Sequence, residues 1–466
     1  MSPRRRAGGS AGRGAGPALP ATPARPLDPY TPRHGSAGYR VLRYELELDY
    51  RVEPNRLAGE ATLHAVAAER VQRLEVDLSA ALAVSRVSVN GARPQRWSRR
   101  GNRFAITLTE PVEAGAPLEI VIAYSGTPRP LRSEWGHVGW EELEQGVLVA
   151  SQPTGAPSWF PCNDHPSQKA TFRVQITADS LYAVLCPGEL VSRRGRASRT
   201  TWLYEQHEPM ATYLAVVHVG PYTRVELPGV HVPQAAWLPP GTEAAASLDL
   251  GRQDAMMQLF ERVFGPYPFA RYDVVVTPDA LEIPLEAQGM STFGSNFMDG
   301  RRTQERLVAH ELAHQWFGNC VSVASWRHIW LNEGFACYAE WLWAEAAGVG
   351  TADEHARRHW ARLRSLPQDL VLADPGPRQM FDDRVYKRGA LTVHSLRILL
   401  GDNGFQDVVQ SWVDAHRHAC VTTEQLRAHI EARVSSTALR HEIARTLDAW
   451  LLERRLPALP AGQRSS

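Results

Sequence analysis

Hydrophobic and polar residues alternate in short runs over the first half of the chain, which is the pattern of half-buried strands. The clearest run is Tyr44–Tyr50, in which every second residue is apolar. Turn residues such as Asn90-Gly91 separate these runs. We therefore predict an antiparallel β domain, a sandwich or a saddle, over residues 39–226. Further strands are predicted at 60–66, 74–78, 103–108, 118–124, 170–176 and 213–219.

After about residue 240 the apolar residues recur every three or four positions, which is the period of an amphipathic helix. A strand-rich interval, Tyr272–Phe297, lies among these helical patterns. The spacing predicts a mainly α domain over residues 227–466, and an α+β multidomain fold for the whole chain. Helices are predicted at 250–264, 302–318, 333–347, 353–365, 386–400, 405–417, 423–433 and 437–454.

Residues 1–38 are rich in Gly, Ala, Pro and Arg and carry few large apolar side chains. Such a segment buries too little surface to offset its loss of entropy on ordering, so we predict a disordered tail. Arg4, Arg5 and Arg6 are not followed by the apolar core of a secretory signal. No run of about 18 apolar residues could span a membrane. We therefore expect a cytoplasmic protein without a membrane partner.

The charges of the chain are balanced, with 51 Lys and Arg against 50 Asp and Glu. This balance argues against nucleic acid as a partner, because nucleic-acid binders usually carry a basic surplus. Of the 51 basic residues only Lys169 and Lys387 are lysines. Five widely spaced cysteines, without a Cys-x-x-Cys pair, indicate reduced thiols rather than a disulfide framework.

The sharpest chemical signal is His310-Glu311-Leu312-Ala313-His314, within the helix predicted at 302–318. Residues four apart share one helix face, so both imidazoles can reach one metal ion. Glu311 lies beside them, where its carboxylate can deprotonate a metal-bound water. The alternative is that the motif arose by chance and that the two histidines are simply exposed on a helix. Shuffling this composition gives such a pentapeptide with a probability of roughly 0.04.

A catalytic zinc keeps three protein ligands and leaves its fourth position to water, so a third ligand is needed. Glu333 follows His314 after eighteen intervening residues. Asn332 is a suitable N-cap, which places Glu333 in the first turn of the next helix. Cys320 is an alternative ligand on the intervening loop, although thiolates are more typical of closed structural sites. We predict one Zn²⁺ held by His310, His314 and Glu333, as in thermolysin-type zinc peptidases.

This metal motif resembles that of the aminopeptidase N family of zinc metallopeptidases, which includes the leukotriene hydrolases. The resemblance covers most of residues 40–400 and implies a thermolysin-like catalytic domain behind the β domain. Four further segments carry it, in the order of the family: Pro161–Phe172, Pro209–Leu214, Phe264–Phe269 and Tyr386–Leu391.

The resemblance also implies roles for individual residues. Tyr386 matches the tyrosine whose phenol donates a hydrogen bond to the oxyanion of the transition state. Glu286 matches the glutamate that binds the free α-amine of the substrate, although the family's Gly-x-Met-Glu-Asn reads Ile-Pro-Leu-Glu-Ala here. Gln152 matches a glutamine that the β domain contributes beside the amine. Arg388 stands where the family usually has lysine.

Glu340 lies seven residues after Glu333, two turns along the same helix. Two interpretations stay open: it accepts the second ring N–H of a zinc-bound histidine, or it pairs with an arginine. Only 80 residues follow Tyr386. Because many members of the family add a long helical C-terminal domain, we expect a more open cleft here.

Together these features predict a zinc aminopeptidase that removes N-terminal amino acids from peptides with a free N-terminus. Three alternatives remain at this stage: a thermolysin-like endopeptidase without an amine anchor, a non-catalytic peptide-binding scaffold on the same fold, and, less favoured, a leukotriene-type epoxide hydrolase. Neither the oligomeric state nor the preferred N-terminal residue follows from the sequence.

Overall fold

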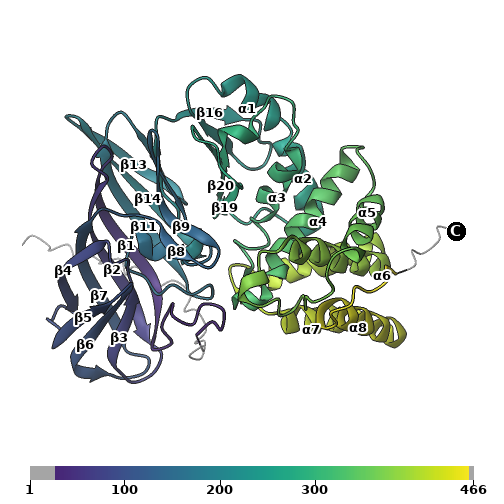
Figure 1. The fold of residues 1–466 in the computed structure, drawn as a ribbon, viewed down its shortest axis with the longest axis horizontal. Coiled ribbons are helices and arrows are strands. Elements are labelled where there is room, and N and C mark those ends of the chain that lie inside the picture. Colours follow the sequence, from purple (N-terminus) through teal and green to yellow (C-terminus); the bar gives the residue numbers. More distant parts are fainter. Residues whose placement is uncertain (1–26, 461–466) are drawn as a thin grey trace, which may run out of the picture.

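The computed structural model describes residues 27–460, which form a β-rich N-terminal part and a largely helical C-terminal part lying side by side (Figure 1). The main sheet of the N-terminal part has seven strands. β1 (Tyr39–Arg51) pairs antiparallel with β2 (Arg56–Ala67) but parallel with β11 (Lys169–Asp179), so the sheet is mixed rather than wholly antiparallel. Its order is β13 (Glu189–Arg196), β14 (Arg199–Ala211), β11 (Lys169–Asp179), β1 (Tyr39–Arg51), β2 (Arg56–Ala67), β7 (Pro117–Gly126) and β4 (Leu82–Val89).

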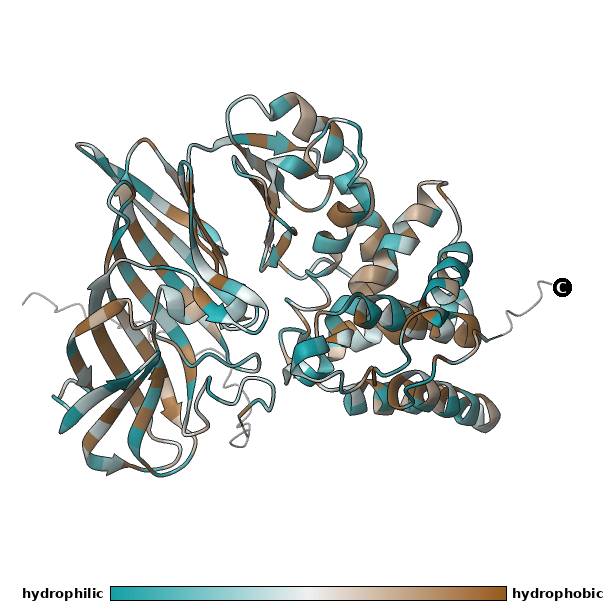
Figure 2. Cartoon of the chain, viewed as in Figure 1, coloured by the Kyte–Doolittle hydropathy of each residue, from teal (hydrophilic) through white to brown (hydrophobic). Residues whose placement is uncertain are grey.

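Alternating burial explains why these segments form strands. Hydrophobic and hydrophilic residues alternate along the strands of the main sheet in Figure 2. In β1 the buried positions include Tyr44, Leu46, Leu48 and Tyr50, which point to one face. Two smaller sheets complete this part: β3 (Val71–Asp77), β6 (Arg103–Val112) and β5 (Arg96–Arg100), and β12 (Ala183–Leu185), β15 (His218–Gly220), β10 (Gly146–Ala150), β9 (Gly136–Leu143) and β8 (Leu131–Ser133).

The strand predicted at 213–219 is shorter in the structure. Thr212–Leu214 form a 3₁₀ turn, and pairing begins only at His218. The hydroxyl of Tyr213 donates a hydrogen bond to the carbonyl of Gly318, at 3.0 Å. The segment therefore leaves the sheet and contacts the C-terminal part of the molecule.

The C-terminal part opens with a five-stranded sheet, followed by a group of helices. β16 (Thr223–Leu227) spans the predicted domain boundary between residues 226 and 227. It pairs with β17 (Gln234–Leu238) and so belongs to this five-stranded sheet. The sheet order is β16 (Thr223–Leu227), β17 (Gln234–Leu238), β18 (Tyr272–Thr277), β20 (Met290–Gly294) and β19 (Leu285–Ala287), and a small pair joins β21 (Ser322–Val323) to β22 (Cys420–Val421).

The helices lie close to the predicted ones. The helices predicted at 386–400 and 405–417 are nearly continuous, with a non-helical backbone at Gly401 that divides them. None of the helices that the structure describes is long and apolar enough to cross a membrane. Their bounds are α1 (Glu243–Asp249), α2 (Gln253–Phe264), α3 (Glu305–Ala313), α4 (Trp330–Ala346), α5 (Ala352–Arg364), α6 (Asp383–Ala415), α7 (Thr423–Arg433) and α8 (Thr437–Leu452).

The two parts meet through buried polar contacts. Lys169 at the start of β11 is buried, and its Nζ donates hydrogen bonds of 2.8 Å to the carbonyls of Asn319 and Cys320. The indole N–H of Trp135 donates to the carbonyl of Pro377, at 2.8 Å. These contacts hold the β-rich part against the loops that surround α3, α4 and α6.

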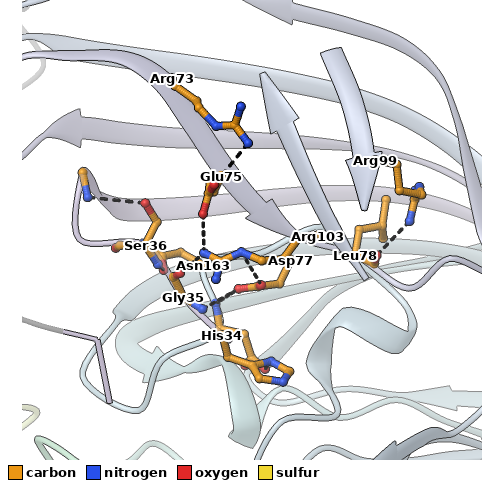
Figure 3. Close-up of polar contacts among 12 residues, drawn as sticks. His34, Gly35, Ser36, Arg73, Glu75, Asp77, Leu78, Arg99, Arg103 and Asn163 are labelled. Atoms are coloured by element: carbon orange, nitrogen blue, oxygen red, sulfur yellow. Dashed lines mark hydrogen bonds and ion pairs between the residues drawn. The ribbon is translucent and has the colours of Figure 1, made fainter. Parts of the chain in front are cut away.

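Residues 27–38, called the strap below, connect the two parts. On the β-rich side, the amide of Gly35 donates to Oδ2 of Asp77 and the amide of Ser36 donates to Oδ1 of Asn163, both at 2.7 Å (Figure 3). Asp77 is buried beneath the strap, and burial raises the pKa of its carboxyl to about 6.

On the side of the C-terminal part the strap has two further anchors. Oδ2 of the buried Asp28 accepts the amide N–H of Trp326, at 2.7 Å, and the hydroxyl of Tyr30 accepts the amide of Gly376, also at 2.7 Å. Residues 27–38 thus make defined contacts, in contrast to the disordered tail expected over residues 1–38. A few polar anchors, rather than apolar burial, hold the strap. Residues 1–26 lie outside the described residues, and their disorder stays a prediction.

Candidate active site

The histidine motif lies at the end of α3, on a buried face. His310 is in the last turn of the helix, and His314 is the residue that caps its C-terminus. The helix ends five residues before the predicted bound of 318, but His314 keeps helical backbone angles. The two imidazoles therefore still lie one turn apart, with ring centroids separated by 4.8 Å.

Glu333 lies in the first turn of α4, as expected, although the helix starts earlier than predicted. α4 begins at Trp330 after a 3₁₀ turn, so Asn332 is inside the helix and Ile329 takes the N-cap position. Oε2 of Glu333 lies 3.6 Å from Nε2 of His310 and 3.5 Å from Nε2 of His314. All three side chains are buried.

These three donor atoms fit a tetrahedral zinc ion. Ligand atoms about 2.1 Å from a tetrahedral zinc are about 3.4 Å from one another, close to the two separations observed here. Cys320, the alternative ligand, is not among the donor groups within the described residues; its Sγ accepts the amide of His418 instead, at 3.5 Å.

The second nitrogen of each imidazole is held by another group. Nδ1 of His314 lies 3.0 Å from the carbonyl oxygen of Phe317, which can only accept a hydrogen bond, so Nδ1 carries the proton. Nδ1 of His310 lies 2.8 Å from Oε1 of Glu340. Both rings thus turn Nε2, the free acceptor nitrogen, toward Glu333. Of the two interpretations of Glu340, the contact with a histidine is present, and an arginine, Arg306, pairs with its other oxygen at 3.3 Å.

Three carboxylates, those of Glu286, Glu311 and Glu333, lie close to His314. Donor atoms of Glu286, Glu311 and His314 lie within 4.8 Å of one another. Burial, together with the nearby carboxylate of Glu333, raises the pKa of Glu311 to about 8 and that of Glu286 to about 7. Buried negative charge in excess of its partners is the electrostatic setting that suits a divalent cation. Oε2 of Glu311 is also buried without a hydrogen-bond partner among residues 27–460.

Tyr386 lies in the first turns of α6, beside His310. The two rings are nearly parallel, with an angle of 21° and centroids 6.1 Å apart. Burial raises the pKa of the Tyr386 phenol well above its usual value, and the carboxylates of Glu333 and Glu286 add to this. The phenol therefore keeps its proton at neutral pH and can act as a hydrogen-bond donor.

Two glycines bring α4 and α6 together at the site. A Cβ atom on Gly334 would lie 2.8 Å from Cα of Gly389, and one on Gly389 would lie 2.7 Å from Cα of Gly334. The helix backbones are thus in direct contact at the residue after Glu333 and three residues after Tyr386. No other residue type fits this crossing without moving a helix.

Glu286 lies on β19, the edge strand of the five-stranded sheet in the C-terminal part, opposite Ser291 of β20. Its Oε1 accepts a hydrogen bond of 2.7 Å from Nε2 of Gln152, which follows β10 in the β-rich part. Gln152 and Glu286, 134 positions apart in the sequence, are therefore in contact beside His314 and Glu311.

Two basic residues that follow Tyr386 have contacts that the sequence does not reveal. Arg388 is buried and donates hydrogen bonds only to backbone carbonyls, mostly at the C-terminal end of α8. Its acceptors are the carbonyls of Leu370, Ala449, Trp450, Glu453 and Arg454. Lys387 turns the other way and reaches Cys337 and Glu340 on α4.

A β-rich domain joined to a helical domain that carries two histidines and a glutamate is the architecture of a metallopeptidase. Comparison with known families agrees: the peptidase family M1 domain matches residues 248–450, and the peptidase M1 N-terminal domain matches residues 41–214. The chain belongs to the M1 family of peptidases. The predicted resemblance and fold class are thereby confirmed.

Solved and curated relatives are similar over most of the chain. The M1 zinc metallopeptidase of Deinococcus radiodurans is 32% identical with a TM-score of 0.85, and the match covers 94% of this chain and 99% of that one. Aminopeptidase M1-D of Oryza sativa subsp. japonica is 27% identical over 84% of this chain. Human endoplasmic reticulum aminopeptidase 1 is 27% identical over 70%. The chain spans less than half the length of these two curated relatives, 47% and 37%.

Proposed function

We propose that this protein is a zinc-dependent aminopeptidase that removes single residues from the N-terminus of peptides. His310, His314 and Glu333 would hold one zinc ion, since their donor atoms have the separations that a tetrahedral ion requires. When bound, zinc supplies Lewis acidity, which polarises a carbonyl and lowers the pKa of a water molecule. The similarity to zinc metallopeptidases supports this cofactor.

Glu311 is the proposed general base and acid. Its free Oε2 can take a proton from the attacking water and then deliver it to the nitrogen of the leaving amine. The hydroxyl of Tyr386 would donate a hydrogen bond to the oxyanion that forms at the scissile carbonyl.

The contact between Gln152 and Glu286 is the observation that carries the aminopeptidase assignment. In a substrate, the α-nitrogen lies only about 2.5 Å from the carbonyl carbon of the same residue. A carboxylate within 4.8 Å of Glu311 can therefore bind an α-ammonium directly beside the bond that is cleaved. Gln152, a neutral donor, would fix this carboxylate without neutralising its charge. An endopeptidase would have no use for such an anchor.

The relatives also support this substrate class. The Deinococcus enzyme has been crystallised as a mutant bound to the tripeptide Tyr-Ser-Ala, and the curated relatives are named aminopeptidases. A tripeptide with a free N-terminus is therefore a suitable probe for this chain.

The test is a panel of fluorogenic amino-acyl substrates and Tyr-Ser-Ala, each paired with its N-acetylated form, with and without a zinc chelator. We expect chelator-sensitive cleavage of the free forms only. Glu286→Ala should lower kcat/KM for the free forms by about 10²-fold or more, because a buried ion pair to the substrate is lost. Equal cleavage of acetylated peptides, or an unaffected Glu286→Ala variant, would favour an endopeptidase. A protein that binds no zinc and cleaves nothing would favour a scaffold.

A further inference from the structure

Two cations contact Glu340, the carboxylate that holds His310. Nη1 of Arg306 lies 3.3 Å from one oxygen, and Nζ of Lys387 lies 4.0 Å from the other, the one that accepts from His310. The two differ in environment, since 56% of the Arg306 side chain is exposed but only 11% of the Lys387 side chain. Water and salt screen an exposed charge far more than a buried one, so Lys387 acts more strongly on Glu340.

Lys387 is held in this place by a second contact. Its Nζ donates to Sγ of Cys337, at 3.2 Å, one turn before Glu340 on α4. Burying an ammonium group is unfavourable unless it is paired. The buried ammonium group of Lys387 is therefore paired with two groups of α4, the Glu340 carboxylate and the Cys337 thiol.

Position on the helix explains why Lys387 reaches this carboxylate. Consecutive residues on a helix point about 100° apart. Tyr386 faces the ring of His310, Arg388 faces the end of α8, and Lys387 is directed between them at α4. One turn of α6 thus acts on the same histidine in two ways: Tyr386 lies against its ring, and Lys387 contacts Glu340, which in turn contacts Nδ1 of the ring.

We propose that Lys387 is a positioning residue of the zinc site. By fixing the orientation of the Glu340 carboxylate, it holds the His310 ring with Nε2 directed at Glu333 and His314. This inference rests on the proposed zinc site. Groups that orient a metal-binding histidine typically change metal affinity by about 10- to 100-fold, and a residue one contact further away should have a smaller effect.

The experiment is a zinc-affinity titration by competition with a fluorescent chelator. It compares wild type with Lys387→Met, with Arg306→Met as the matched control on the same carboxylate, and with Glu340→Gln alone and combined with Lys387→Met. We expect Lys387→Met to weaken zinc binding about 3- to 10-fold, and Arg306→Met by less than about 2-fold. In the Glu340→Gln background, Lys387→Met should have no further effect, because the two act through one contact.

Thermal melting of each chelator-treated variant separates positioning from folding. If Lys387→Met does not fold, Lys387→Gln replaces it, since a neutral amide can still donate to Cys337. Zinc affinity equal to wild type in the folded variant would overturn the proposal, and so would an equal loss in the Glu340→Gln background. Failure of the proposed function is distinguishable, because the wild-type protein itself would then bind no zinc.

Discussion

The Gln152 side chain donates a hydrogen bond of 2.7 Å to the carboxylate of Glu286 across the junction of the two domains. One oxygen of Glu286 is thereby occupied by a neutral donor from the β-rich part. The proposed amine-binding carboxylate therefore depends on both domains, whereas the histidines and Glu333 belong to one.

Removing this donor should weaken substrate binding more than chemistry. In Gln152→Ala the carboxylate of Glu286 loses a buried hydrogen bond to a charged group, which is worth about 1.5–3 kcal/mol. We expect KM for amino-acyl anilides to rise about 10- to 100-fold, with kcat little changed. Steady-state kinetics measure this. A fall in kcat at unchanged KM would contradict the assignment of Gln152 to amine binding.

Replacing the proposed base should remove activity and leave the metal in place. Glu311→Gln keeps the shape of the side chain but cannot accept a proton, so kcat should fall by about 10²- to 10⁴-fold. Zinc content, measured by atomic absorption, should stay at one ion per chain because Glu311 is not a ligand. Loss of zinc from the variant would instead place Glu311 among the ligands.

Arg388 should matter to stability through α8. In Arg388→Met the buried carbonyls near the end of this helix lose a charged donor, and we expect a loss of about 2–4 kcal/mol in the free energy of unfolding. Arg388→Lys should be intermediate, because an ammonium group has three donors against the five of guanidinium. Arg357→Met serves as the control, since its exposed ion pair with Asp353 contributes about 0.5 kcal/mol or less. Equal melting temperatures for all three variants would refute this.

Asp28 should stabilise the strap. Asp28→Ala leaves the buried amide of Trp326 without an acceptor, and an unsatisfied buried donor costs about 1–3 kcal/mol. Asp28→Asn keeps an acceptor oxygen and should lose less. Melting temperature and the rate of proteolytic cleavage within residues 27–38 measure the effect. Wild-type values for Asp28→Ala would show that the strap contributes nothing to stability.

Lys169 gives a prediction for pH. Burial lowers the pKa of Lys169 in the folded protein below its usual value of 10.5, which holds when the chain is unfolded. Between these two pKa values the unfolded chain binds more protons, so this residue makes the free energy of unfolding rise with pH. The increase should end near pH 10.5 and be absent in Lys169→Met. Urea midpoints of both proteins over this range test it; parallel curves would contradict the prediction.

Much of the site follows from the sequence because its central groups are local. Two histidines four apart on one helix must share a face, and Glu311 must lie next to His310. Proposing Glu311 as the general base therefore needs no information about the rest of the fold. The order of the domains is equally visible, since the period of the apolar residues changes from two to about four.

Other features depend on contacts between distant segments, which periodicity cannot supply. A helical pattern shows that Lys387 and Arg388 point in different directions, but not that Glu340 lies beneath one and the end of α8 beneath the other. The strap is similar. Residues 27–38 have few apolar side chains, and their anchors, Asp28 and Tyr30, find partners about 300 or more positions away.

The crossing of α4 and α6 at Gly334 and Gly389 gives the site a particular vulnerability. Glu333, as a proposed metal ligand, and Tyr386, as the proposed oxyanion donor, belong to different helices, and their spacing is set where neither helix has a side chain. A single methyl group at either glycine would separate them while leaving every functional group in the protein intact. A Gly334→Ala or Gly389→Ala variant would therefore keep every sequence motif of the site and still be expected to lose activity.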